Sequence, residues 1–142
     1  MGVAEALKAA NPRVKIMAVE PVGLRAEAPK EVTKHLSIIK HKVEGIGDGF
    51  IPQIVSVDLI DDWMQVCDED AIETACTLAR EKGLFVGISS GANVYASLQV
   101  AKNLGKGKVV VTVLPDNADR YYTTALFKKS CCERSSKRGK AC

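Results

Sequence analysis

The second half of the chain alternates short, largely apolar segments with segments whose apolar side chains recur at helical spacing. Residues 59–66, 84–88 and 108–114 have strand length, and the last of them reads KVVVTVL. Residues 68–83 and 89–104, which lie between them, have helical spacing. Strands that are apolar on both sides and alternate with helices are typical of a parallel sheet with helices on both faces. The pattern therefore predicts the α/β fold class.

The remaining sequence predicts three further regular elements. Apolar positions at helical spacing predict a helix over residues 2–10, and residues 14–19 predict a short buried strand. Residues 20–52 form a long stretch that contains several prolines and glycines, which favours an irregular connection with a function. Residues 119–128 predict a final short helix. Asp68 is expected to be the N-cap of the helix that it precedes.

Composition argues against several classes of function. The 142 residues carry a formal charge of +3 and 5% aromatic residues, which disfavours a nucleic-acid partner. No apolar run approaches the roughly 18 residues of a membrane-spanning helix, so no membrane partner is expected. The five cysteines lack paired spacing, which favours a reduced, intracellular chain and gives no metal site.

The end of the chain differs from the rest. Residues 128–142 hold six of the 20 Lys and Arg residues and three of the five cysteines. They show no apolar periodicity, which predicts a basic, solvated and disordered extension. The sequence therefore divides into a folded unit over residues 1–127 and a tail over residues 128–142.

Residues 87–91, Gly-Ile-Ser-Ser-Gly, join a predicted strand to a predicted helix. The spacing fits the nucleophile elbow of the α/β hydrolases, but that fold needs a histidine after the serine, and His35 and His41 precede Ser89. A second interpretation is that Ser89 directs its hydroxyl to a ligand at a helix N-terminus, which favours an anion or an electron-rich atom. A third is that Ser89 and Ser90 only cap the helix. Local spacing leaves the last two open.

Residues 45–49, Gly-Ile-Gly-Asp-Gly, form a second candidate site. Their glycine density suits a loop that cradles phosphate, but Phe50-Ile51-Pro52 follows in place of a helix, so a dinucleotide fingerprint is not indicated. The loop is either a tight turn that needs positive φ angles or a backbone that closes over a small ligand. The local sequence does not separate these two interpretations.

Three segments together resemble cysteine synthase, also called O-acetylserine sulfhydrylase. They read HKVEGIGDGFIP (41–52), LFVGISSGANVYASLQVA (84–101) and VLPDNADRYYTTALF (113–127), and they occur in the family's order. The resemblance covers about residues 1–127. It implies the fold type II of pyridoxal phosphate (PLP) enzymes, a tryptophan-synthase-β-like fold shared with cystathionine β-synthase. It also implies β-replacement of O-acetylserine by sulfide, small-molecule substrates, a homodimer and a cytoplasmic location.

The resemblance assigns roles to single residues. The family's serine that faces the pyridine nitrogen of PLP falls on Ser89, which is the predicted cofactor-binding residue. Pro115-Asp116 matches a Pro-Asp turn that borders the same side of the ring. Gly45 matches the loop near the substrate and is the predicted substrate-binding residue. A neutral hydroxyl at the ring nitrogen makes the ring a weaker electron sink, which suits elimination of a β-leaving group.

Three parts of the family's machinery have no counterpart among these residues. They are the Schiff-base lysine, the Ser/Thr-Gly-Asn-Thr loop that binds the substrate carboxylate and the loop that cradles the PLP phosphate, so no catalytic residue is assigned. We therefore expect a C-terminal piece of the enzyme that is inactive alone. Two alternatives stay open: a piece of a cystathionine β-synthase-like enzyme, and a non-catalytic remnant that pairs with a full-length subunit.

Overall fold

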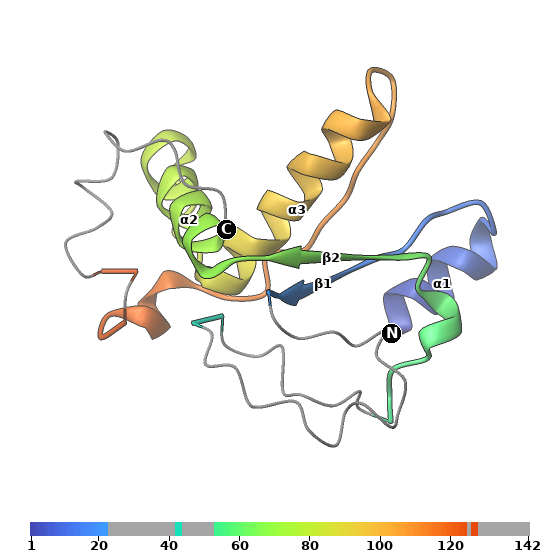
Figure 1. Cartoon of the computed structure of the whole chain (residues 1–142), viewed down its shortest axis with the longest axis horizontal. Coiled ribbons are helices and arrows are strands. Elements are labelled where there is room, and N and C mark those ends of the chain that lie inside the picture. The colour runs from blue at the N-terminus through green and yellow to red at the C-terminus, as the bar shows by residue number, and fades with distance from the viewer. Residues whose placement is uncertain (23–41, 44–52, 125, 128–142) are drawn as a thin grey trace.

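The computed structural model describes residues 1–22, 42–43, 53–124 and 126–127. Within these residues, helices and strands are connected by loops and by short 3-10 turns (Figure 1). The helices are α1 (Gly2–Ala10), α2 (Asp68–Lys82) and α3 (Ile88–Leu104), the strands are β1 (Met17–Pro21) and β2 (Asp62–Val66), and the 3-10 turns are Val57–Leu59 and Ala118–Tyr121.

The strands β1 and β2 form a parallel sheet. Their register pairs Met17 with Asp62 at one end and Pro21 with Val66 at the other. The N–H of Val22 continues the ladder by donating to the carbonyl oxygen of Val66 at 3.1 Å. Parallel strands cannot be joined by a tight turn, so the chain between them crosses over. The parallel sheet and its helices confirm the α/β fold class.

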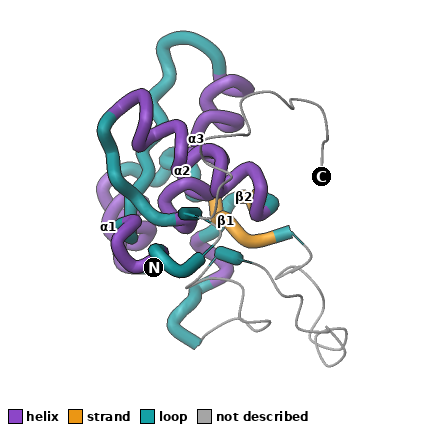
Figure 2. Tube along the Cα trace, turned by 90° about the vertical axis from the view of Figure 1, so that its left-hand side faces the viewer, coloured by secondary structure: helices purple, strands orange, loops and turns teal. Residues whose placement is uncertain are grey.

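The helices α2 and α3 lie side by side next to the carboxyl ends of the strands (Figures 1 and 2). Their interface is built from small residues, and a Cβ at Gly91 would overlap with the carbonyl oxygen of Ala71 and crowd Ala75. Ala92 and Ala96 continue this buried surface along α3. The two helices can therefore approach closely, and their contact forms the centre of the core.

A single carboxylate connects α1 to the beginnings of both strands. Asp61 precedes β2 and accepts a hydrogen bond at 2.7 Å from the main-chain N–H of Ile16, which precedes β1. It also pairs with Lys8 of α1 at 2.8 Å and with Lys15 at 3.2 Å. The hydrogen bonds from Lys8 and Ile16, with the charge of Lys15, hold the pKa of this carboxyl well below its ordinary value. Asp61 therefore holds the beginnings of β1 and β2 next to each other.

Two of the predicted strands are wrong. Residues 84–88 are not a strand, and among the described residues Val86 forms only an antiparallel bridge with Asn117. Residues 108–114 also lie outside any described strand, and Val109 is 85% exposed. A continuous apolar run predicts neighbours on both sides, but it does not say which segments supply them. The described sheet holds β1 and β2 alone, so neither run is flanked by strands.

The ends of the helices and strands can be compared with those predicted from local sequence patterns. The first three predicted helices, expected over residues 2–10, 68–83 and 89–104, are confirmed to within one residue at each end. The first strand begins at Met17 rather than at residue 14, because Asp61 binds the chain before the ladder starts. The N-cap of α2 is Cys67 rather than Asp68. The last predicted helix is reduced to the 3-10 turn Ala118–Tyr121 within the described residues.

Cys67 and Cys76 are each disulfide-bonded in the structure, whereas the sequence favoured a reduced chain. The predicted tail over residues 128–142, with Cys131, Cys132 and Cys142, lies outside the described residues. In the part of the chain that the structure describes, no group of His, Cys, Asp and Glu side chains could hold a metal ion. In the same part, no helix combines the length and apolar character that a bilayer crossing needs.

Candidate functional site

The amino end of α3 is held by a carboxylate from a distant segment. Oδ2 of Asp116 accepts a hydrogen bond from the main-chain N–H of Ser89 at 3.1 Å, and Oδ1 accepts one from the N–H of Ser90 at 2.9 Å. The hydroxyl of Ser90 also donates to Oδ1. The first N–H groups of a helix have no intrahelical acceptor, and Asp116 supplies acceptors for two of them. Asp116 therefore caps α3 from outside the helix.

Gly87 is the N-cap residue of α3 and lies directly against this carboxylate. Its N–H donates to the carbonyl oxygen of Asp116 at 3.1 Å, next to the bridge between Val86 and Asn117. A Cβ at Gly87 would overlap with the Asp116 carboxylate and with the ring of Tyr121. The backbone φ angle of Gly87 is −85°, which any residue adopts. Close approach of the two side chains, rather than backbone conformation, therefore requires glycine here.

Tyr121 completes the set of donors around the carboxylate. It lies on the 3-10 turn Ala118–Tyr121, is 3% exposed, and donates its hydroxyl to Oδ2 of Asp116 at 2.6 Å. Burial raises the pKa of the Asp116 carboxyl, but the hydrogen bonds from Ser90, Tyr121 and Ser89 outweigh burial and hold the pKa below its ordinary value. The carboxylate is therefore ionised at neutral pH, where it accepts hydrogen bonds and has no proton to donate.

Ser89 lies in the first turn of α3, as expected, and is 8% exposed. The interpretation that Ser89 and Ser90 cap the helix is wrong, because the N-cap is Gly87 and the acceptors belong to Asp116. The structure does not test the hydrolase interpretation, because both histidines lie outside the described residues. The contact of Ser89 with the PLP ring stays a prediction.

Asp116 restricts what the amino end of α3 can bind. A free helix N-terminus favours an anion, but here a carboxylate already occupies that position. A phosphate would meet like-charge repulsion from it. A neutral ring atom with a lone pair meets no such repulsion, and the hydroxyl of Ser89 can donate a hydrogen bond to such an atom. The residues present therefore fit the ring-nitrogen end of PLP and do not fit its phosphate end.

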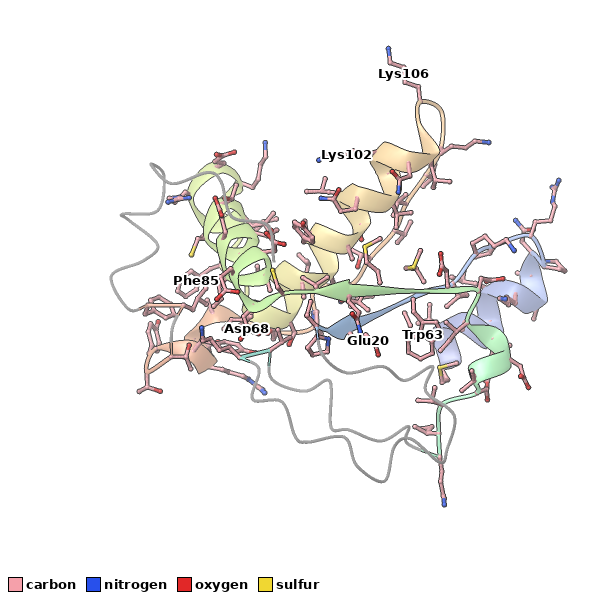
Figure 3. All side chains as sticks on the ribbon, viewed as in Figure 1. Glu20, Trp63, Asp68, Phe85, Lys102 and Lys106 are labelled. Carbon is pink, nitrogen blue, oxygen red and sulfur yellow. The ribbon has the colours of Figure 1, made fainter. Side chains whose placement is uncertain are left out.

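A second polar pair lies toward the carboxyl end of the sheet. Glu20 of β1, labelled in Figure 3, is 8% exposed. Gln65 of β2 is its partner in the strand register and donates from Nε2 to Oε1 of Glu20 at 3.1 Å. Ligands of parallel α/β sheets bind outside the carboxyl ends of the strands. Sequence analysis missed this pair, and the signal available for it was an acidic residue that ends an apolar run, VKIMAVE.

The predicted site is only partly described. Gly45 and the rest of the loop over residues 45–49 lie outside the described residues, so the structure does not place the predicted substrate-binding residue relative to Ser89. Sequence analysis gave Asp116 a place beside the ring but missed its bonds to the first turn of α3. It also missed Tyr121, for which only the fold provides a signal.

Comparison with known proteins identifies the family. The sequence matches the family PALP, pyridoxal-phosphate dependent enzyme, over residues 1–116. It is 41% identical over 126 residues to the cysteine synthase of Staphylococcus aureus (strain Mu50), which covers 89% of this chain and 39% of that protein.

The structure is similar to solved structures of the same kind. Cysteine synthase from Entamoeba histolytica has a TM-score of 0.79 and 32% identity, over 98% of this chain and 38% of that one. A hydrogen sulfide-producing enzyme from Fusobacterium nucleatum has a TM-score of 0.77 and 39% identity, over 91% and 37% of the two chains. The chain thus spans about two-fifths of the length of these relatives. The resemblance to cysteine synthase and the expectation of PLP as the cofactor are confirmed, and the chain belongs to the pyridoxal-phosphate dependent enzyme family.

Proposed function

We propose that this chain is part of a cysteine synthase, which replaces the acetate of O-acetylserine with sulfide to give L-cysteine. The observation that carries the proposal is the first turn of α3, where GISSGA places Ser89 next to N–H groups that Asp116 already holds. Such a turn suits a ring nitrogen and disfavours a phosphate. The 41% identity to the S. aureus cysteine synthase supports the same reaction. PLP, when bound, supplies the electron sink for loss of the β-leaving group.

Ser89 is proposed to bind the ring nitrogen of PLP. Its hydroxyl can donate a hydrogen bond to a pyridine nitrogen but, unlike a carboxylic acid, cannot hand over a stable proton. This limits electron withdrawal by the ring and favours β-elimination over racemisation or transamination. The Ser89 N–H is held by Asp116 at 3.1 Å, so Asp116 and Tyr121 orient the turn without touching the reacting atoms themselves.

By itself the chain is proposed to be inactive. No lysine of the sequence aligns with the Schiff-base position, so no residue here is assigned to proton removal from the substrate. Residues 1–127 are proposed to form part of the C-terminal domain of the enzyme, with Gly45 on the loop that contacts a small-molecule substrate. Residues 128–142 are proposed to be an extension without a part in the reaction.

A chimera tests the proposal. The region of the S. aureus cysteine synthase that matches this chain is replaced by the corresponding residues of this chain, and cysteine formation from O-acetylserine and sulfide is measured. We expect an active chimera that retains PLP, whereas the chain alone with added PLP forms no cysteine. Ser89→Ala in the chimera is expected to weaken PLP retention, measured by dialysis and cofactor absorbance.

Ser97→Ala is the matched control for Ser89→Ala, because Ser97 lies on the same helix and donates to the carbonyl oxygen of Asn93 at 2.7 Å. It is expected to leave PLP retention unchanged. A folded, PLP-containing chimera that forms cystathionine from homocysteine in preference to cysteine would assign the chain to the other synthase. A lysine of the chain alone that is trapped on PLP by borohydride would contradict its inactivity.

The compartment is also a proposal. We propose a cytoplasmic location, as the resemblance to an amino-acid-forming enzyme implies. The bonds at Cys67 and Cys76 weigh against it, since disulfides are rare in the cytosol. Cell fractionation tests this, and recovery of the chain in the cytosolic fraction is the expected result.

A further inference from the structure

Hydrogen-bond donors fill the acceptor positions of the Asp116 carboxylate. An ionised carboxylate offers about four lone-pair positions, shared equally between its oxygens. Oδ2 accepts the N–H of Ser89 at 3.1 Å and the hydroxyl of Tyr121 at 2.6 Å. Oδ1 accepts the N–H of Ser90 at 2.9 Å and also the Ser90 hydroxyl. Each oxygen therefore has its full set of donors, and the carboxylate has no position left for another.

The side chain of Ser89 is a natural competitor for these positions. Its hydroxyl belongs to the same residue whose N–H already binds Oδ2. Rotation about χ1 moves a serine hydroxyl between staggered positions, and so toward or away from groups that its own N–H contacts. A hydrogen bond from a hydroxyl to a carboxylate is roughly twice as strong as one to a neutral acceptor such as a pyridine nitrogen. An Asp116 with an open position would therefore compete with the PLP ring for the Ser89 proton.

We propose that Tyr121 and Ser90 are positioning residues for the cofactor, because their hydroxyls fill Asp116 and leave the Ser89 hydroxyl to donate to the ring nitrogen of PLP. This inference rests on the proposed assignment of Ser89 to that nitrogen. Tyr121 binds the same oxygen as the Ser89 N–H and is 3% exposed. Ser90 is 0% exposed and fills the other oxygen. Burial of both donors keeps water from taking their places on the carboxylate.

The proposed role differs from that of a purely structural bond in one respect. If the bonds to Asp116 only stabilise the fold, each further loss at this carboxylate should add to the damage. If instead the bonds keep Asp116 from the Ser89 proton, a weaker acceptor at residue 116 should undo the effect of a lost donor on the cofactor. A neutral amide is such an acceptor, so Asp116→Asn separates the two roles.

The chimera with the S. aureus enzyme tests the inference, with PLP isotopically labelled at the ring nitrogen and followed by nitrogen NMR. Tyr121→Phe is expected to move the ring-nitrogen resonance toward that of pyridine without a hydrogen bond. It should also raise the apparent dissociation constant of PLP about fivefold, as the loss of one hydrogen bond does. Ser90→Ala opens Oδ1 and should move the resonance in the same direction. Tyr122→Phe is the control, because Tyr122 is 63% exposed, and should change neither quantity.

Asp116→Asn in the Tyr121→Phe background is the deciding measurement. We expect the resonance to return toward that of the unchanged chimera, although chemical denaturation shows a further loss of stability. A resonance that stays displaced in the double variant, or that neither Tyr121→Phe nor Ser90→Ala moves, overturns the inference. Helical circular dichroism confirms that each variant is folded.

Ser89→Ala separates failure of this inference from failure of the proposed function. If Ser89→Ala moves the ring-nitrogen resonance and the changes at Tyr121 and Ser90 do not, the role of Ser89 stands and only the positioning role is wrong. If Ser89→Ala leaves the resonance unchanged, Ser89 does not bind the ring nitrogen and both proposals are wrong.

Discussion

The two long helices begin in different ways, although both follow segments at the carboxyl end of the sheet. The first turn of α2 carries three acids, Asp68, Glu69 and Asp70, so its own sequence supplies the negative charge that a helix N-terminus favours. The first turn of α3 carries none and depends on Asp116, which lies beyond the end of that helix in the chain. The negative charge at the start of α2 is therefore locally encoded, and Asp68 also accepts hydrogen bonds from the N–H of Lys42. The start of α3 is stable only when the fold brings Asp116 to it.

Removal of the distant carboxylate is expected to have the largest effect. Asp116→Ala leaves the donors of Ser89, Ser90 and Tyr121 without their acceptor, and it should lower the free energy of unfolding by about 3 kcal/mol. The matched change at α2, Asp68→Ala, removes a first-turn charge and the acceptor of the Lys42 N–H, and it should lower the free energy of unfolding by about 1 kcal/mol. Urea denaturation followed by circular dichroism measures both. Equal losses would mean that the two helix starts do not differ in energy.

Substitution of Gly87, which lies directly against the Asp116 carboxylate, is expected to have the second largest effect on stability. Gly87→Ala forces a Cβ into the Asp116 side chain and the Tyr121 ring, and it should lower the free energy of unfolding by about 2 kcal/mol. Gly2→Ala is the control, since a Cβ at Gly2 meets nothing within 4 Å. That change should be neutral or slightly stabilising, because alanine favours a helix. A neutral Gly87→Ala would show that Asp116 can move away without cost.

A smaller loss is expected from the tyrosine. Tyr121→Phe removes one donor of the carboxylate while keeping the buried ring, so the free energy of unfolding should fall by about 1 kcal/mol. Tyr122→Phe is the matched control, because Tyr122 is 63% exposed. Chemical denaturation of the two variants side by side is the measurement. If Tyr122→Phe lowers the free energy of unfolding as much as Tyr121→Phe does, the hydrogen bond from Tyr121 to Asp116 does not stabilise the start of α3.

The smallest expected effect is a pH dependence. The pKa of Asp116 in the folded chain lies below its ordinary value of 3.8, so ionisation contributes stability that is present above that value and is lost as the pH falls through the folded pKa. The difference in unfolding free energy between wild type and Asp116→Asn should stay constant from about pH 7 to about pH 5 and shrink below about pH 4. A difference that persists unchanged at lower pH would exclude the carboxylate charge as its source.

The same comparison explains which parts of the molecule the sequence could predict. Helical spacing and a glycine at residue 83 located α2, because its acids, its apolar stripe and its end are all encoded within the helix. The strand predicted over residues 108–114 failed because its burial depends on neighbouring strands, which a local apolar run does not specify.

The sequence predicted the locally encoded part of the candidate site and missed the part that depends on the fold. The resemblance gave Ser89 and its place at the start of α3, which the helix bounds agree with. It gave the position of Asp116 but not its bonds to both serines, since these link residues that are 26 and 27 positions apart. The burial of Glu20 against Gln65 depends on the register of β1 with β2, and no single segment encodes that register.

The position of Asp61 has a consequence for how this protein could change over time. The Asp61 carboxylate holds the chain just before each strand begins. Residues added to or removed from the preceding turns would therefore leave the register of β1 with β2 unchanged. A replacement of Asp61 itself would release the two entry points from each other. We therefore expect insertions and deletions to be tolerated in the turns that precede Ile16 and Asp61. Substitutions of Asp61 itself should be tolerated poorly.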